Sequence, residues 1–155
     1  MKNTGNKMAQ LLRIDDRLIH GQVVVGWANA LHPKDIILID DEIAEDQMEK
    51  EIYLLGVPIE YNGVVYSVEE ASIKLKESAD FIAVCKSPCE ALKLFKSGFH
   101  FQELNLGGMH DKNETKMINH YIYLSETDIK NLDTLKNNGV EIFIQDLPNS
   151  KKIIY

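Results

Sequence analysis

The sequence lacks the features that would direct a chain into a membrane, onto nucleic acid or into an oxidising compartment. No stretch approaches the ~20 consecutive apolar residues of a membrane-spanning helix, and the first ten residues are polar, without the apolar run of a signal peptide. The 24 acidic residues outnumber the 17 basic ones, which argues against nucleic acid and anionic lipid as partners because both demand basic surface. Cys85 and Cys89 are its only cysteines, which suits a reducing compartment. We therefore expect a soluble cytoplasmic protein.

The length and composition are those of one globular domain. A chain of 155 residues, of which 45% are apolar and 26% charged, is able to bury a substantial core. The sequence contains no internal repeat, low-complexity segment or long linker. We expect residues 1–10 to form a flexible N-terminal extension and residues 11–155 to form the folded domain.

Short apolar runs alternate with helical patterns along the chain. Ser67, Ser87 and Ser125 each precede an acidic residue by three positions, which is the spacing of a capping box at the start of a helix. Two further helices are expected over residues 23–31 and 43–55. Strands are expected over residues 11–14, 36–39, 64–66, 81–85, 104–106, 121–124 and 140–144. This alternation predicts a single-domain α/β fold, an open, mostly parallel sheet with helices on both faces.

Open α/β sheets bind their ligands at the turns that follow the strands. The first of these turns, within residues 13–22, holds two arginines, two aspartates and a histidine directly before a helix. Arginine and a helix N-terminus both favour a phosphate group, and His20 supplies a nucleophilic ring nitrogen. Asp15 or Asp16 is placed to fix the tautomer of that ring. The set suits a reversible phosphohistidine, because phosphoryl transfer depends mainly on positioning and electrostatics.

Charged turns of this kind also occur in other classes of protein. On charge pattern alone, a solvated loop that caps a helix fits equally well. A P-loop is disfavoured because Trp27 and Ala28 stand where that motif needs Lys and Ser or Thr. A dinucleotide-binding site is disfavoured because no G-x-G-x-x-G follows the first strand. A receiver domain is disfavoured because Tyr66 and Ser67 stand where its acceptor aspartate belongs.

The run RIDDRLIHGQV, residues 13–23, resembles the signature of a known family. It is similar to that of the mannose/sorbose-type IIB component of the bacterial phosphoenolpyruvate-dependent sugar phosphotransferase system. The similarity spans about residues 11–150 in the expected order, whereas residues 1–10 and 56–64 fit the family less well. Beyond the first turn it is carried by residues 40–42 (DDE), 67–71 (SVEEA), 86–88 (KSP), 105–109 (NLGGM) and 139–141 (GVE).

The resemblance implies a phosphocarrier that works as a subunit of a protein-N(pi)-phosphohistidine–sugar phosphotransferase. His20 would receive a phosphoryl group from the histidine of a IIA component, itself charged by the carrier HPr. It would pass that group to a sugar delivered by the membrane components IIC and IID, which places the chain in the cytoplasm beside the permease. The resemblance also implies that Arg13 and Arg17 lie beside the phosphate and that Asp15 helps to order the loop. It implies no cofactor and no metal.

The sequence also suggests roles for several residues outside the first turn. Gly107 and Gly108 follow a strand, so we expect their N–H groups to line the phosphate site, the alternative being an ordinary flexible turn. Lys86 is equally consistent with extra positive charge near the site and with no role there. Residues 40–42 are expected to be loop and helix-start acids rather than magnesium ligands. Trp27 is expected to pack in the core. His110 is expected to be a loop residue, the alternative being one that approaches the phosphate or a partner.

Two rival functions use the same fold. One is a regulatory module that reports phosphorylation through binding alone, and the other is an unrelated α/β enzyme that binds a phosphorylated metabolite. Intact Arg13, Arg17 and His20 favour the carrier over the module, because a binding module has no need of the nucleophile. The identity of the sugar and the oligomeric state have no readable signal in this sequence.

Overall fold

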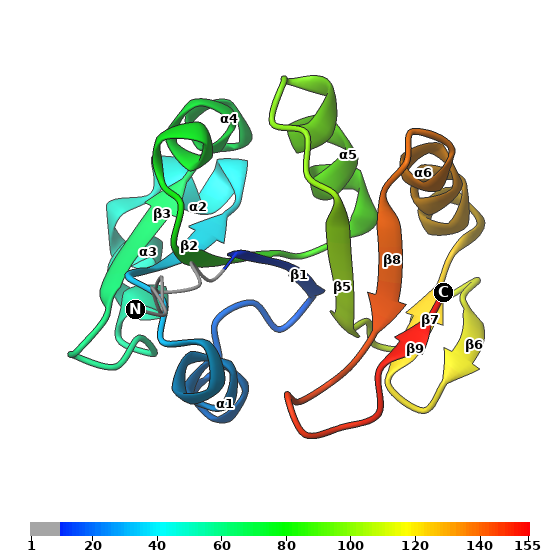
Figure 1. Cartoon of the computed structure of the whole chain (residues 1–155), viewed down its shortest axis with the longest axis horizontal. Helices are drawn as coiled ribbons and strands as arrows, with labels where there is room; N and C mark the ends of the chain where they lie inside the picture. Colours follow the sequence, from blue (N-terminus) through cyan, green and yellow to red (C-terminus); the bar gives the residue numbers. More distant parts are fainter. Residues whose placement is uncertain (1–9) are drawn as a thin grey trace, which may run out of the picture.

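Nine strands and six helices are formed within residues 10–155, the part of the chain that this computed structural model describes (Figure 1). The predicted extension over residues 1–10 lies outside the described residues except for Gln10, which begins the first strand. The strands are β1 (Gln10–Asp15), β2 (Asp35–Ile39), β3 (Asn62–Tyr66), β4 (Phe81–Cys85), β5 (Glu103–Gly108), β6 (Lys116–Asn119), β7 (Ile122–Leu124), β8 (Glu141–Ile144) and β9 (Ile153–Ile154). The helices are α1 (Gly21–Leu31), α2 (Asp41–Glu45), α3 (Gln47–Leu54), α4 (Val68–Glu77), α5 (Pro88–Lys96) and α6 (Glu126–Asn137).

Seven of the strands form one sheet in the order β3-β2-β4-β1-β5-β8-β9. Every neighbouring pair is parallel except β8 and β9, which are antiparallel. Strand β4, which lies between β2 and β1, is buried along its whole length, as expected for a parallel strand that is covered on both faces. The predicted open, mostly parallel sheet is therefore confirmed.

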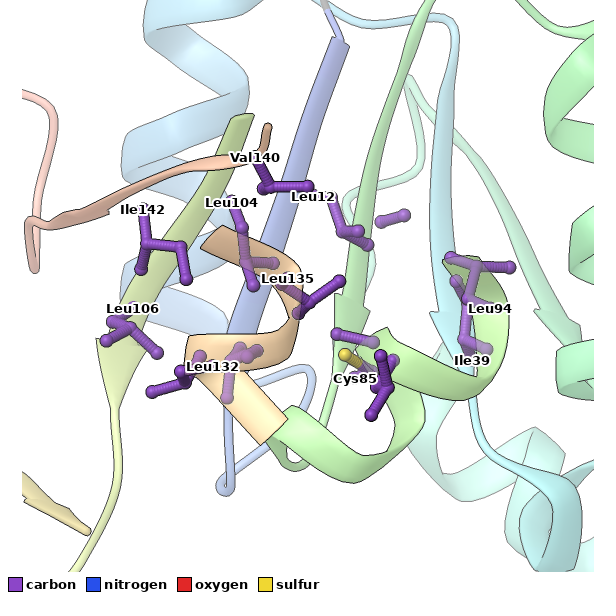
Figure 2. Close-up of a cluster of buried hydrophobic side chains, with 14 of the residues drawn as sticks. Leu12, Ile39, Cys85, Leu94, Leu104, Leu106, Leu132, Leu135, Val140 and Ile142 are labelled. Carbon is purple, nitrogen blue, oxygen red and sulfur yellow. The ribbon is translucent and has the colours of Figure 1, made fainter. Parts of the chain in front are cut away.

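Helices cover both faces of this sheet, and each face has its own apolar cluster. Because successive side chains of a strand point to opposite faces, Leu12 joins the cluster under α4, α5 and α6, whereas Leu11 joins the cluster under α1, α2 and α3. Figure 2 shows the first cluster, in which Leu132 and Leu135 of α6 pack over Leu104 and Leu106 of β5. Burial on both faces fixes the strands whose ends carry the polar turns.

The predicted helix starts agree with the structure at all three serines, and the predicted capping box is complete at two of them. Ser67 and Ser125 form complete capping boxes at the start of α4 and α6. Ser87 also caps its helix, but its hydroxyl accepts from the backbone N–H of Cys89 and donates to the carboxylate of Glu90. It therefore caps α5 without the reciprocal pair of a capping box.

One expectation about the elements is wrong, and a second is right about the strand but not about the sheet that it joins. Residues 43–55 do not form one helix, because Asp46 adopts extended dihedrals (φ −109°, ψ 108°) and begins α3 by accepting from the N–H of Glu49. The strand expected at residues 121–124 forms β7, which pairs antiparallel with β6 outside the main sheet. Among the described residues, no helix is long and apolar enough to cross a membrane.

Candidate functional site

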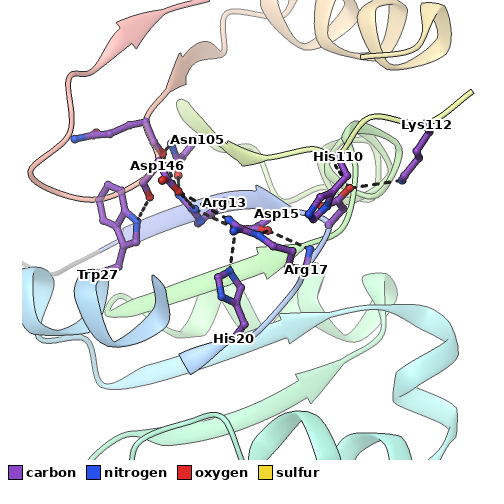
Figure 3. Close-up of polar contacts among 11 residues, drawn as sticks. Arg13, Asp15, Arg17, His20, Trp27, Asn105, His110, Lys112 and Asp146 are labelled. Atoms are coloured by element: carbon purple, nitrogen blue, oxygen red, sulfur yellow. Dashed lines mark hydrogen bonds and ion pairs between the residues drawn. The ribbon is translucent and has the colours of Figure 1, made fainter. Parts of the chain in front are cut away.

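The turn after β1 lies where the chain path through the sheet changes direction. From β1 the chain crosses through α1 to β2 on one side, whereas from the neighbouring β5 it proceeds to β8 on the other side. Connections that leave in opposite directions open a crevice at the carboxyl ends of the two strands. Polar side chains from β1, from β5 and from the turns after β1, β5 and β8 meet there (Figure 3).

Arg13 of β1 is the most deeply buried cation of this cluster. Its Nη1 donates to Oδ1 of Asn105 at 2.7 Å and to the backbone oxygen of Gln145 at 3.0 Å, and its Nη2 donates to Oδ2 of Asp15 at 3.0 Å. Burial lowers the pKa of the Arg13 guanidinium, and the contacts with Asp15 offset only part of that effect. A buried charge needs such partners, so Arg13 links β1, β5 and the turn after β8.

Gly107 provides the space for this guanidinium. A Cβ atom at Gly107 would lie 2.0 Å from Cζ of Arg13, so a side chain fits there only if Arg13 moves. A Cβ atom at Gly108 would lie 3.0 Å from Nη2 of Arg17 and 3.1 Å from Oδ1 of Asp15. The structure therefore places both glycines against the arginine cluster.

Asp15 connects the two arginines. Its carboxylate is fully buried, and it accepts from Nε and Nη2 of Arg17, both at 2.9 Å, as well as from Arg13. Burial disfavours the charged carboxylate, but the hydrogen bonds from Arg17 and the charge of Arg13 outweigh this effect and lower the pKa of Asp15. The same hydrogen bonds raise the pKa of Arg17. The side chain of Arg17 is 36% exposed, so Arg17 is the arginine on the open side of the cluster.

His20 is the residue that precedes α1, with extended dihedrals (φ −131°, ψ 137°) and no capping bond from its side chain. The buried side chains of Leu18 and Ile19 anchor the turn that presents it. The His20 side chain is 31% exposed, yet its Nε2 is buried without a hydrogen bond, 3.6 Å from Oδ2 of Asp15. The first turn of α1 contains no acidic residue, so the partial positive charge of the helix N-terminus is not neutralised there.

Asp16 pairs with His110 and does not contact His20. Its Oδ1 lies 2.6 Å from Nδ1 of His110, and its Oδ2 accepts from the backbone N–H of His110 at 2.8 Å. Lys112 adds an ion pair at 3.7 Å, and the backbone N–H of Asp16 donates to the carbonyl of Gly108 at 3.0 Å. These contacts hold the turn after β5 against the turn after β1. Of the two aspartates considered for His20, only Asp15 lies near its ring.

Three polar residues of the cluster were missed by the sequence analysis. Asn105 is fully buried in β5, and Asp146 in the turn after β8 places Oδ1 3.7 Å from Nη2 of Arg13. The backbone oxygen of Gln145 also accepts from Nδ2 of Asn105. An amide inside an apolar strand and an acid directly after a strand were the available signals. Trp27 is buried as expected, and its indole N–H donates to the backbone oxygen of Asp146 at 2.9 Å.

The acids of residues 40–42 start a helix, as expected. Asp40 accepts from the N–H groups of Glu42 and Ile43 at the start of α2, and Asp41 accepts from the N–H of Val68. Lys86 lies 3.2 Å from Oδ2 of Asp40. Burial opposes the charge on Lys86, but Asp40 outweighs it and raises the pKa of the ammonium group. Residues 10–155 contain no cluster of three or more side chains suited to hold a metal ion.

These observations define a class of protein. It is an open α/β protein whose crevice presents an arginine and a histidine beside the N-terminus of a helix, an arrangement suited to an anionic group.

Comparison with known proteins narrows this class. The family model described as the sorbose subfamily IIB component of the phosphotransferase system matches residues 9–153. The chain is 30% identical over 148 residues to the N-acetylgalactosamine-specific phosphotransferase enzyme IIB component 1 of Escherichia coli (strain K12), covering 92% of each chain. It is 26% identical over 148 residues to the mannose-specific EIIAB component of the same strain, covering 92% of this chain and 46% of that one.

A solved structure of a IIB component has the same fold as this chain. The crystal structure of the N-acetylgalactosamine-specific IIB component 1 from Escherichia coli superposes with a TM-score of 0.86 at 28% identity, covering 92% of this chain and 96% of that one. The chain therefore belongs to the sorbose subfamily of IIB components of the sugar phosphotransferase system.

Proposed function

We propose that His20 accepts a phosphoryl group from a IIA component and passes it to a sugar held by the membrane components IIC and IID. The observation that carries this proposal is the placement of His20 at the open N-terminus of α1, with its buried Nε2 facing Asp15. The partly exposed Arg17, held by the same Asp15, supplies the positive charge that a phosphoryl group needs. Membership in the IIB family supports phosphoryl transfer as the activity.

The reacting atom in this proposal is Nδ1 of His20. Nε2 is buried and faces a carboxylate, so the exposed part of the ring lies away from Nε2. A proton on Nε2 leaves the lone pair on Nδ1, which is then free to attack phosphorus. Asp15 favours this tautomer because its negative charge stabilises a proton on the facing nitrogen.

The proposed transfer is an in-line displacement. Nδ1 of His20 forms a bond to phosphorus while the bond from phosphorus to the donor histidine breaks, and the donor ring keeps the electron pair. The ring of His20 then carries a positive charge on its protonated Nε2, and the carboxylate of Asp15 compensates for it. Arg17 and the N–H groups that open α1 hold the phosphoryl oxygens, while Gly107 and Gly108, both buried in β5, leave room for the two arginines. Arg13 is buried, so we assign it the task of holding Asp15 in place.

Names of relatives support the proposed partners. The mannose-specific relative is named as an EIIAB component, which supports a IIA protein as the donor. Names of relatives include N-acetylgalactosamine and mannose, so we propose a hexose or an N-acetylated hexosamine as the acceptor. In this proposal the chain works at the cytoplasmic face of the membrane, beside IIC and IID. Residues 10–155 offer no evident base for the sugar hydroxyl, and we assign that role to the membrane components.

One experiment tests the proposal directly. The full chain is incubated with phosphoenolpyruvate, the general phosphotransferases and its cognate IIA, and the phosphorylated residue is identified by mass spectrometry. We expect an acid-labile phosphate on His20, absent from the His20→Ala variant. Acid-stable phosphate on another residue, or no phosphate with an active donor, would overturn the proposal. Phosphorylation of His20 without transfer to sugar by membranes that carry IIC and IID would instead favour a regulatory module.

A further inference from the structure

A strip of large apolar side chains lies exposed on α3 and the turn that follows it. The strip consists of Met48, Ile52, Leu55 and Ile59. The first three are spaced by four and three residues, which places them on one face of a helix. No residue of α3 is fully buried, and this outward face has no covering element among the described residues. An exposed apolar strip with a polar rim is typical of a surface that binds another molecule.

The rim of this strip is strongly acidic. Residues 41–60 contain seven acidic residues and one lysine, so this segment carries most of the net charge of −7. Glu45, Asp46, Glu49, Glu51 and Glu60 are all exposed. A partner for this face must therefore supply apolar contacts together with basic groups.

The strip lies close to the proposed phosphorylation site. A Cβ atom at Gly56, next to Leu55, would lie 3.2 Å from Cγ2 of Ile19, the residue before His20. Tyr53 and Leu54 pack in the same apolar cluster as Ile19. A macromolecule that brings its substrate to His20 and extends over this edge of the molecule would cover Leu55 and Ile52.

We propose that the strip formed by Met48, Ile52, Leu55 and Ile59 docks onto the membrane component that presents the sugar, through a basic cytoplasmic loop. This inference rests on the proposed function. Cytoplasmic loops of membrane proteins carry an excess of Lys and Arg, which complements the acidic rim. Anionic lipid would be repelled by that rim, and so would a second copy of the chain, because a two-fold interface would place two acidic rims opposite each other.

The test separates phosphorylation of His20 by IIA from transfer of the phosphoryl group to the sugar. The double variant Ile52→Ser/Leu55→Ser is compared with the unmodified chain, first as acceptor from phosphorylated IIA in solution. It is then compared as donor to sugar in membrane vesicles that carry IIC and IID. We expect the first rate to be unchanged and the concentration needed for half-maximal sugar phosphorylation to rise about tenfold or more, since burying one Ile or Leu is worth at least that factor. The matched control is Ile73→Ser, because Ile73 of α4 is 57% exposed against 59% for Ile52 and lies on the opposite face of the sheet. We expect Ile73→Ser to change neither rate.

Each other outcome overturns the inference. An equal loss in both half-reactions would assign the strip to the donor IIA, and a loss of self-association would assign it to a second copy. No loss, or the same loss in Ile73→Ser, would leave the strip without a docking role.

Binding is also measured without phosphorylation, by sedimentation with the same vesicles. Vesicles of anionic lipid alone should bind neither chain, and equal binding to them would favour a lipid surface. Because this sedimentation experiment needs no phosphate on His20, it tests docking by the strip even where the proposed function fails.

Discussion

At the scale of single residues, one buried carboxylate organises the candidate site. Asp15 accepts hydrogen bonds from both arginines and faces Nε2 of His20. The two arginines differ in their surroundings, because Arg13 is enclosed by acceptors whereas Arg17 reaches the open side. The sequence places all four residues within positions 13–20 but does not reveal this difference in exposure, because the exposure of each side chain depends on which strands lie beside β1.

Replacing Arg17 tests its role in transfer. We expect Arg17→Ala to slow phosphorylation of His20 about 100-fold, because one preorganised charge contact with a transition state is worth roughly that factor. Arg17→Lys should recover only part of the rate, since lysine keeps the charge but loses the planar pair of donors. The measurement is the rate of phosphate transfer from IIA, with thermal unfolding as the check on folding. An unchanged rate would remove Arg17 from the site.

Replacing Asp15 tests the electrostatics of the cluster. Because the folded-state pKa of Asp15 is lowered, its contribution to stability is complete above its unfolded pKa of about 3.9 and is lost as the pH falls through the lowered folded value. We expect Asp15→Asn to lose about 3–5 kcal/mol of unfolding free energy at pH 7, because two arginines lose a buried partner. Urea unfolding at pH 7, 5 and 3 measures the difference, which should shrink at pH 3. Asp133→Asn on exposed α6 is the control, and a difference that stays constant with pH would contradict the expectation.

At the scale of elements, the site depends on how closely β1 and β5 approach each other. Gly107 of β5 leaves room for the guanidinium that Arg13 projects from β1. The two neighbouring glycines offer a matched pair of substitutions, because the first atoms that a new Cβ meets differ. At Gly107 these atoms belong to the enclosed Arg13, and at Gly108 the nearest is the end of the more exposed Arg17.

We expect Gly107→Ala to destabilise the fold by about 1–3 kcal/mol, the usual cost of inserting a methyl group into a packed interior. Gly108→Ala should cost less stability but should slow transfer, since Arg17 is displaced. Thermal and urea unfolding, together with the transfer rate, distinguish the two variants. Gly26→Ala of α1 serves as the control, because a Cβ there would lie 3.6 Å from Cδ2 of Leu147, an ordinary van der Waals contact. Equal effects at Gly107 and Gly26 would contradict the close approach of Arg13.

How far the sequence predicts each element depends on whether its signals are local. The parallel strands and the caps of α4 and α6 were predictable from apolar runs and from serine spacing. Strand β6 was not, because only two of its four residues are apolar and none is buried, and its pairing with β7 is a tertiary feature. Asn105 and Asp146 were missed as site residues for a related reason, since each contacts Arg13 only because β5 and β8 follow β1 in the sheet order.

At the scale of the whole molecule, a phosphate site in the crevice couples binding to folding. A ligand that binds only the folded state stabilises it, by about 2.7 kcal/mol when its concentration is 100 times its dissociation constant. We expect inorganic phosphate to raise the melting temperature relative to chloride at the same ionic strength, and to do so much less in Arg17→Ala. Differential scanning calorimetry provides the measurement. The same rise in both proteins would mean that phosphate acts outside this crevice.

The short strand β9 has a consequence for the outer border of the sheet. Ile153–Ile154 pairs antiparallel with β8, so the hydrogen-bonding groups that β8 would otherwise present to solvent are occupied. Two residues, preceded by Lys151 and Lys152, form too short and too charged a template for a further strand. Uncontrolled growth of the sheet from molecule to molecule, the route by which β-structure aggregates, is thus disfavoured at this border.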